Sequence, residues 1–252
     1  MTDHQTSVLT GPSTYDGRMT GQKTLVVGND RFRIGPRRGS TEIASMVPLP
    51  GAGQVQQESL HRTIDALRQR GFRHVITSAL GPRELDPFLR GGFTPHHELH
   101  LLTKQLGPLA PPDRTVLRRA RRGDWDNVLA IDAVAFTHFW QFDRVGLRDA
   151  LDATPQRRFQ VVRSQPTVGY HIAGLAGSSG YLQRLAVHPG EHGRGLGSAL
   201  LTDALSWMHR RGARIAYVNT QLENRTALDL YLRNGFDLEH QRLTVLQRPI
   251  DA

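Results

Sequence analysis

Residues 185–208 read LAVHPGEHGRGLGSALLTDALSWM, and this stretch decides the fold. Its first residues are typical of a short apolar strand, its middle is rich in glycine, and its end has the spacing of an amphipathic helix. A glycine-rich turn that opens a helix brings free backbone N–H groups together with the positive end of the helix dipole. Because Gly193, Gly195 and Gly197 carry no side chains, the stretch predicts a binding site for a phosphate group.

The spacing of these glycines differs from two common phosphate-binding motifs. It is neither the G-x-G-x-x-G of dinucleotide-binding turns nor the G-x-x-x-x-G-K-[ST] of nucleoside triphosphate-binding loops. We therefore expect a different pyrophosphate-bearing ligand.

Composition sets the broad class of the protein. The chain has 252 residues, 38% of them hydrophobic and 22% charged, which suits a globular protein with an ample core. It has no cysteine, which excludes disulfides, thiolate metal sites and cysteine nucleophiles.

No apolar run is long enough to span a membrane, and the polar residues 1–22 resemble a disordered tail, so we expect a cytoplasmic protein. The net charge of +9 is spread over both halves, which favours a solvated basic surface over a nucleic-acid site.

The chain contains an internal duplication. The proline-rich residues 107–113 mark a linker between a domain at 23–106 and a second at 114–252. Residues 70–77 resemble 211–218, and in the same order FLRGGF at 88–93 matches YLRNGF at 231–236. The first copy is shorter and has Gln54 and Gln56 where the second has glycines, so we interpret it as a truncated, degenerate repeat.

Periodicity predicts an α/β (α+β) fold in which helices flank a mixed central sheet. Asp124 is the expected N-cap of the first helix of the second half. Expected strands in the first half cover 24–27, 31–34 and 43–48, with a helix at 60–67. In the second half, strands are expected at 115–119, 158–163, 167–175, 180–187, 215–220 and 238–246, and helices at 146–153, 195–211 and 224–234.

These motifs resemble the GNAT superfamily of acyl-CoA-dependent N-acetyltransferases. The family's R/Q-x-x-G-x-G/A loop corresponds to residues 192–197, with His192 in place of Arg or Gln. Its L-x-V-x-P strand corresponds to residues 185–189, and its N-x-x-A-x-x-L-Y-x-x-x-G-F helix to residues 224–236. The resemblance covers about 114–250. The tandem layout with a degraded first copy resembles that of mycothiol synthase and other tandem acetyltransferases.

The resemblance implies a cosubstrate, acetyl-CoA, and a set of residues that bind it. The pyrophosphate would lie on the glycine loop, and the pantetheine arm between two splayed strands, 181–187 and 215–220. Tyr231 would act as the general acid that protonates the departing thiolate. The implied cofactor-binding residues are Leu185, Ala186, Val187, His192, Gly193, Arg194, Gly195, Leu196, Gly197, Ser198, Asn224 and Tyr231.

The implied reaction is transfer of an acetyl group to a primary amine by direct attack, without a metal. A small-molecule acceptor is favoured over a peptide, because the extra half would wall off the acceptor side.

The identity of the general base stays open, because strand 181–185 lacks the glutamate of many relatives; His138, Tyr170 and Glu223 are candidates. His96-His97-x-x-His100 is interpreted as a strand edge rather than a metal site. Two alternatives remain: a non-catalytic acyl-CoA sensor or scaffold, and an acetyltransferase of a protein N-terminus or lysine.

Overall fold

The computed structural model describes residues 21–49, 51, 53–108 and 116–250. Within these ranges the first half contains five strands and two α-helices, and a 3-10 turn, η1, joins two of the strands. The elements are β1 (Lys23–Val27), β2 (Asp30–Pro36), η1 (Arg37–Gly39), β3 (Ile43–Pro48), α1 (Gln57–Arg68), β4 (His74–Leu80), α2 (Pro82–Arg90) and β5 (Thr94–Gln105).

The second half repeats the β-α-β-α-β order of β3 to β5 after a longer lead-in. Its elements are β6 (Leu117–Arg119), η2 (Arg122–Asp124), α3 (Trp125–Ala135), η3 (His138–Trp140), α4 (Arg144–Asp152), β7 (Gln156–Val162), β8 (Gly169–Ala176), β9 (Ser179–Val187), η4 (Pro189–Glu191), α5 (Leu196–Arg210), β10 (Ile215–Gln221), α6 (Arg225–Arg233) and β11 (Asp237–Pro249). The expected α/β class with a mixed sheet flanked by helices is confirmed.

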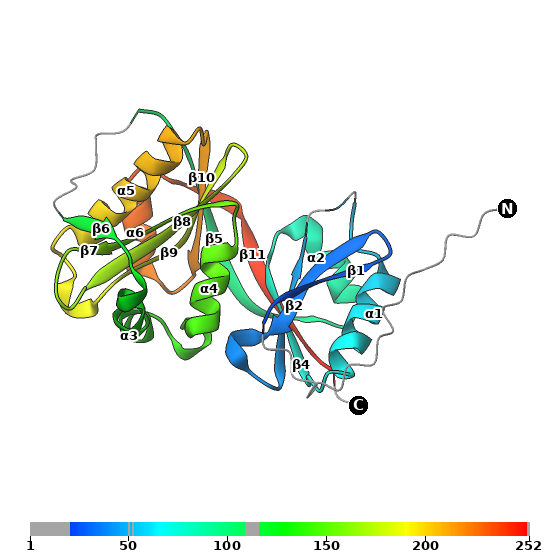
Figure 1. Ribbon diagram of the computed structural model, residues 1–252. Helices are drawn as coiled ribbons and strands as arrows, with labels where there is room; N and C mark the ends of the chain where they lie inside the picture. Colours follow the sequence, from blue (N-terminus) through cyan, green and yellow to red (C-terminus); the bar gives the residue numbers. More distant parts are fainter. Residues whose placement is uncertain (1–20, 50, 52, 109–115, 251–252) are drawn as a thin grey trace.

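One sheet runs through both halves of the molecule. Its 11 strands lie in the order β1-β2-β3-β4-β11-β5-β10-β9-β8-β7-β6. The two last strands of the repeats are exchanged: β11 pairs with β4 of the first half, and β5 pairs with β10 of the second. Figure 1 shows β5 and β11 passing between the two lobes. The expected division at 107–113 stays a prediction, and residues 109–113 lie outside the described ranges.

The core of the second half has a layer of helices on each face of the sheet. Tyr170 and Ile172 of β8 pack in a cluster with Val128 and Ile131 of α3. The following residues, Ala173 and Leu175, contribute to the cluster of α5 and α6. Successive strand residues point to opposite faces, which is why one strand serves both layers.

Two local expectations were right only in part. Asp124 is the N-cap residue of α3, as expected, but its side chain does not bond to the helix; its carboxylate instead accepts hydrogen bonds from the Arg118 guanidinium and the Arg121 backbone. His100 lies inside the sheet, where it pairs with Thr220 of β10 and Arg242 of β11, whereas His96 and His97 lie beyond Leu99, at which the pairing of β5 with β10 ends. These partner strands come from distant parts of the sequence, so a local pattern could not place the three histidines.

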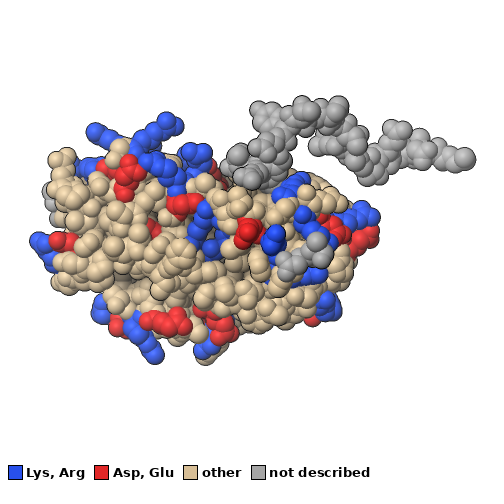
Figure 2. All heavy atoms as spheres, turned by 90° about the horizontal axis from the view of Figure 1, so that it is seen from below, with Lys and Arg blue, Asp and Glu red and all other residues tan. Residues whose placement is uncertain are grey.

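The surface is mixed in charge. On the face seen in Figure 2, Lys and Arg side chains lie among Asp and Glu side chains over both halves. Of the helices in the described ranges, none combines the length and the apolar character that a membrane crossing requires.

Candidate active site

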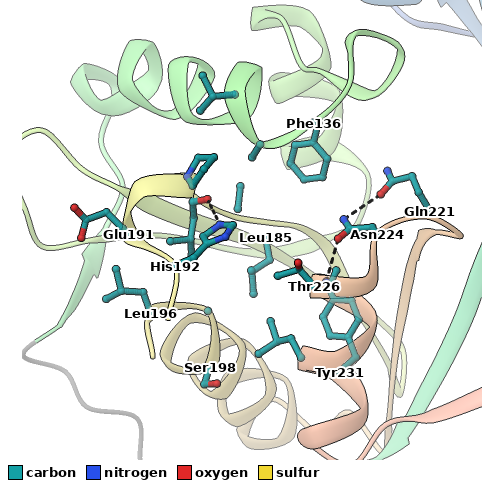
Figure 3. A pocket seen from close by; sticks show the side chains of 18 of the residues that line it. Phe136, Leu185, Glu191, His192, Leu196, Ser198, Gln221, Asn224, Thr226 and Tyr231 are labelled. Atoms are coloured by element: carbon teal, nitrogen blue, oxygen red, sulfur yellow. Dashed lines mark hydrogen bonds between the residues drawn. The ribbon is translucent and has the colours of Figure 1, made fainter. Parts of the chain in front are cut away.

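A cavity of about 780 Å³ opens beside β9 and the N-terminal ends of α5 and α6. Figure 3 shows Leu185 of β9 near its centre, with His192 on one side and Asn224 and Tyr231 on the other. Its lining combines the glycine loop, the end of β9, the first turns of α6 and a wall from α3 and η3. The lining residues used below are His97, Phe136, Trp140, Leu185, Ala186, Val187, Glu191, His192, Gly193, Gly195, Leu196, Gly197, Ser198, Gln221, Glu223, Asn224, Tyr231 and Arg233.

The cavity reaches the sheet because β9 and β10 diverge. The two parallel strands pair only from Ser179 to Tyr181 on β9 and from Ile215 to Tyr217 on β10. Beyond that point β10 continues against β5, as far as the pair Gln221 and Leu99. Within the described chain, the stretch of β9 that contains Leu185 and Val187 therefore has no strand partner on that side. The expected splaying of these strands is confirmed.

The glycine loop provides the open space that a diphosphate requires. Gly193 and Gly195 both have φ of 76°, a left-handed conformation that glycine adopts without strain. A Cβ atom built on either residue would meet nothing within 4 Å, so the space above both backbones is clear. The first backbone N–H groups of α5 have no acceptors within the helix and lie at its positive end. The loop fits the pyrophosphate of coenzyme A.

His192 and Arg194 have partners that limit what they offer to a phosphate. His192 Nε2 lies 3.0 Å from the Val187 carbonyl oxygen. A carbonyl oxygen only accepts hydrogen bonds, so Nε2 must carry the ring proton and donate it to Val187. A neutral His192 ring therefore has no second N–H for a phosphate. Arg194 pairs with Glu191, and Arg194 alone of the expected cofactor-binding residues is not among the lining residues.

Asn224 and Tyr231 enter the cavity from α6. Asn224 Oδ1 accepts a hydrogen bond from the Ala227 backbone at 3.1 Å, so it caps the helix, while its Nδ2 donates to Gln221 Oε1. Tyr231 is 5% exposed, and its ring lies 5.7 Å from that of Phe236. Burial raises the pKa of the Tyr231 hydroxyl well above its ordinary value, opposed by the Arg184 charge. The phenol therefore keeps its proton at neutral pH.

The wall opposite α6 is η3, whose three carbonyl oxygens are each bound by an arginine. Arg38 donates to the His138 carbonyl and Arg37 to the Phe139 carbonyl, both at 3.0 Å. Arg184 donates to the Trp140 carbonyl at 2.6 Å. Burial lowers the pKa of Arg37 to about 10, and burial together with the Arg37 and Arg184 charges lowers that of Arg38 to about 10, so both stay charged at neutral pH.

Arg184 is anchored in turn by a buried carboxylate. Asp132 is fully buried and accepts two hydrogen bonds from the Arg184 guanidinium, at 2.7 and 2.8 Å. The guanidinium also lies over the Phe136 ring, 3.4 Å from its centroid. The sequence alone does not reveal this set, because Asp132 and Arg184 belong to different elements far apart in the chain and no local spacing connects them.

The three candidate bases are placed differently. Tyr170 is fully buried, donates to Asp132, and has a pKa raised far above the ordinary value, chiefly by burial. It is therefore held in the core. His138 lies on η3 outside the lining set, whereas Glu223 is among the lining residues. His97 also lines the cavity, and sequence analysis did not consider it for this role.

Comparisons with known proteins find acetyltransferases. The acetyltransferase (GNAT) family matches residues 125–236. A mycothiol acetyltransferase of Streptomyces scabiei is 30% identical over an alignment of length 159, which covers 58% of this chain and 52% of that protein. The chain thus spans about half the length of this relative.

Two solved structures show the same fold over most of the chain. A tandem GNAT protein from the clavulanic acid biosynthesis pathway superposes with a TM-score of 0.64 at 11% identity, covering 89% of this chain and 80% of that one. A GCN5-related N-acetyltransferase from Kribbella flavida gives a TM-score of 0.59 at 14% identity, covering 91% and 90%.

Proposed function

We propose that this chain, which has a GNAT acetyltransferase domain at residues 125–236, transfers an acetyl group from acetyl-CoA to a primary amine. One observation carries the proposal: a single cavity joins the open glycine loop, the unpaired stretch of β9 and the Tyr231 side chain. Backbone donors bind the diphosphate at one end, and the bare strand edge offers partners to the amides of the pantetheine arm. The thioester is thereby brought to the acceptor side.

The chemistry required of the chain is modest. A backbone N–H of β9 near Leu185 polarises the thioester oxygen, and fixed donors of this kind are usually a large contribution to catalysis. Holding amine and thioester together supplies much of the remaining rate enhancement. Tyr231, which is protonated and faces the cavity, donates its proton to the departing sulfur.

A small acceptor fits the cavity better than a peptide. The acceptor side is walled by Trp140 of η3 and by His97 of the first half, so an extended chain would meet both lobes. The aromatic lining suits an amine with an apolar or sugar-like body. The curated relative is named a mycothiol acetyltransferase, which makes deacetylated mycothiol one member of a test panel.

The test is to incubate the full chain with acetyl-CoA and single amines: glucosamine, an amino-acid amide, deacetylated mycothiol and a short peptide with a free N-terminus. Mass spectrometry follows the acetylated amine and free coenzyme A together. We expect acceptor-dependent release with a small amine. Binding of acetyl-CoA without any acceptor-dependent release would overturn the proposal in favour of an acyl-CoA sensor. Preference for the peptide would overturn the choice of acceptor.

A further inference from the structure

His97 comes from the first half of the chain but lines the cavity of the second. Among the described residues that line this cavity, it is the only one that precedes Val134. It reaches the cavity because β5 is exchanged between the halves, and His97 lies two residues before Leu99, where the pairing of β5 with β10 ends. A titratable side chain on an otherwise distant strand thus faces the acceptor side of the proposed site.

A β-bulge directs this side chain. In the ladder between β5 and β11, Val245 pairs with His97 and Leu246 pairs with Pro95, so His96 has no opposite residue in that ladder. In a regular strand, neighbouring side chains point to opposite faces. Here both rings contact Phe139, at 4.8 Å for His96 and 4.3 Å for His97. Bulges commonly redirect a side chain beside an active site.

The His97 ring is held between tilted aromatic rings. Its centroid is 4.3 Å from Phe139 and 5.3 Å from Trp140. Arg37 lies over the first of these rings, 4.0 Å from the Phe139 centroid. Since the backbone of η3 is bound by three arginines, the rings that hold His97 are themselves fixed. The imidazole is therefore positioned before any substrate arrives.

The other titratable groups of the cavity are less suited to accept a proton from an amine. Glu191 and His192 belong to the pyrophosphate end, where Arg194 and the Val187 carbonyl bind them. Tyr231 is protonated, and Arg233 is a cation. Glu223 remains as a rival, but carboxylates, with an ordinary pKa of about 4, are weak bases for an amine. Imidazole, with an ordinary pKa near 6.5, is closer to the working pH, where general bases are most efficient.

We propose that His97 is the general base that deprotonates the acceptor amine, an assignment that rests on the proposed acetyl transfer. His97 takes one proton from the ammonium group and passes it to solvent, which frees the nitrogen lone pair. The N–C bond to the thioester carbon forms and the C–S bond breaks. Tyr231 gives its proton to the sulfur and regains one from the acylated nitrogen, so the products are amide, free thiol and one proton.

Several charged and titratable groups belong to the elements packed around His97, and they include Arg38 and Arg184, which bind the His138 and Trp140 carbonyls of η3. His96 adjoins it on β5, Arg37 approaches from η1, and η3 adds His138; the β11 residue opposite is the apolar Val245. Burial, followed by the charges of His97 and Arg37, lowers the pKa of His96, so His96 is neutral at pH 7. A general base must be unprotonated to accept a proton, so the rate should have an acidic limb that depends on this base.

The experiment measures kcat and kcat/KM against pH for full-length wild type, His97→Gln and His100→Gln, with the best amine of the panel at saturating acetyl-CoA. His100 is a matched control: it is a histidine on the same strand, paired with Thr220 and Arg242, and is not a lining residue. We expect His97→Gln to lower kcat about 100-fold and to lose the acidic limb. Its dissociation constant for coenzyme A should stay within about twofold of wild type. His100→Gln should keep the wild-type profile.

Rescue separates a catalytic from a structural role. In His97→Ala, added imidazole should restore part of kcat, because the vacated space opens into the cavity. A His97→Gln variant with wild-type rates, or one with lower rates and an unchanged pH profile, would overturn the assignment. So would a Glu223→Gln variant that loses the acidic limb instead. If wild type binds coenzyme A but acetylates no amine, the proposed function itself fails and this assignment fails with it.

Discussion

The two strand–loop–helix units, β3 to α1 and β9 to α5, share a backbone but differ in what occupies the helix N-terminus. Their relationship extends to the turns that follow: Gly71 and Gly212, at corresponding positions of the two repeats, end the two helices with φ of 87° and 91°. The aromatic pairs that come next also correspond. Phe88 lies 5.4 Å from Phe93, and Tyr231 lies 5.7 Å from Phe236.

The difference lies in one hydrogen bond. In the first unit the Gln56 backbone N–H, which aligns with that of Gly197, donates to Asp30 Oδ2 at 3.0 Å. A carboxylate of the chain thus lies where the second unit has space for a phosphate. The side chains of Gln54 and Gln56 fill the same loop with hydrogen bonds of their own. A helix N-terminus binds an external anion only where the chain leaves it open.

The first half has nevertheless kept a part in the site. It supplies β5, which covers β10 where β9 diverges, and it supplies Arg37 and Arg38, which hold η3. Arg38 adopts φ of 51°, a strained value for a residue with a side chain. The half whose own helix N-terminus is filled by its side chains therefore contributes to the wall of the cavity in the other half.

The most severe test copies the first loop into the second. The double variant Gly195→Gln and Gly197→Gln should weaken coenzyme A binding by at least about a thousandfold, or about 4 kcal/mol. At Gly195 the side chain meets a left-handed φ and enters the space of the diphosphate, and at Gly197 it lies close to Leu230. Isothermal titration calorimetry measures the loss.

Gly177→Gln is the control for the backbone cost. Gly177 has φ of 58°, nothing lies within 4 Å of its built Cβ, and it is in the β8–β9 turn away from the cavity. We expect it to lower stability as Gly195→Gln does but to leave coenzyme A binding intact. Equal affinities for the loop variant and wild type would remove the diphosphate from this loop.

The next test makes the aromatic pair of the second half identical to that of the first. Tyr231→Phe should lower kcat about 100-fold while coenzyme A affinity stays within about twofold, because it removes only the acidic proton. Phe88 demonstrates that a phenylalanine packs in this environment. Steady-state kinetics and calorimetry on one preparation measure both quantities.

Tyr217→Phe provides the reference for removing a hydroxyl elsewhere. Its ring stacks on Tyr181, 5.6 Å away, and neither residue lines the cavity. This variant should keep wild-type turnover. Because the pKa of the Tyr231 hydroxyl is raised by burial, the wild-type rate should not fall through its ionisation below about pH 10. Unchanged turnover in Tyr231→Phe would exclude it as the acid.

A smaller effect is expected where the first half holds the acceptor wall. The double variant Arg37→Ala and Arg38→Ala should raise the KM for the amine about tenfold and leave coenzyme A affinity unchanged. Two of the three donors to the η3 carbonyls are then lost, each a hydrogen bond to a charged group. Kinetics with the amine varied at saturating acetyl-CoA measure the change.

The control for this double variant removes two positive charges from another part of the same half. Arg62 and Arg90 are exposed and pair with Glu58 and Asp86 on their own helices. Their double alanine variant should keep the wild-type KM, because surface ion pairs contribute little. An equal rise in both variants would mean that general charge, rather than the held wall, governs acceptor binding.

Sequence patterns predicted those parts of the molecule that are decided locally. The expected helix at 195–211 is α5 at Leu196–Arg210, and the strand expected at 43–48 is β3. Apolar periodicity and helix-ending glycines depend only on neighbours in the chain, and so does the glycine loop. The late strands expected at 238–246 are one longer strand, β11.

What sequence patterns missed depends on partners far apart in the chain. The bulge that redirects His97 exists only because β11, the last strand of the chain, pairs with β5 of the first half. The contact between Arg37 and Phe139 likewise joins the two halves. The Asp124 side chain binds Arg118 on a neighbouring strand end instead of the first turn of α3, because an arginine competes for it and helix propensity does not include that charge. The bulge follows from strand exchange, which leaves no local signature in the sequence.

The smallest effect tests the carboxylate that fills the first site. Asp30→Ala should lower the free energy of unfolding by about 1 kcal/mol, because α1 loses a hydrogen bond and a negative charge at its positive end. Asp30→Asn should lose less, since an amide oxygen still accepts the bond. Asp65→Ala, near the other end of α1, should change the free energy of unfolding by a few tenths of a kcal/mol at most, because there a carboxylate opposes the dipole.

Urea unfolding of the three variants ranks their free energies of unfolding, and calorimetry should still find one coenzyme A per chain. A second bound coenzyme A in Asp30→Ala would show that the carboxylate alone closes the first site, whereas equal stabilities for Asp30→Ala and Asp65→Ala would show that it stabilises nothing there.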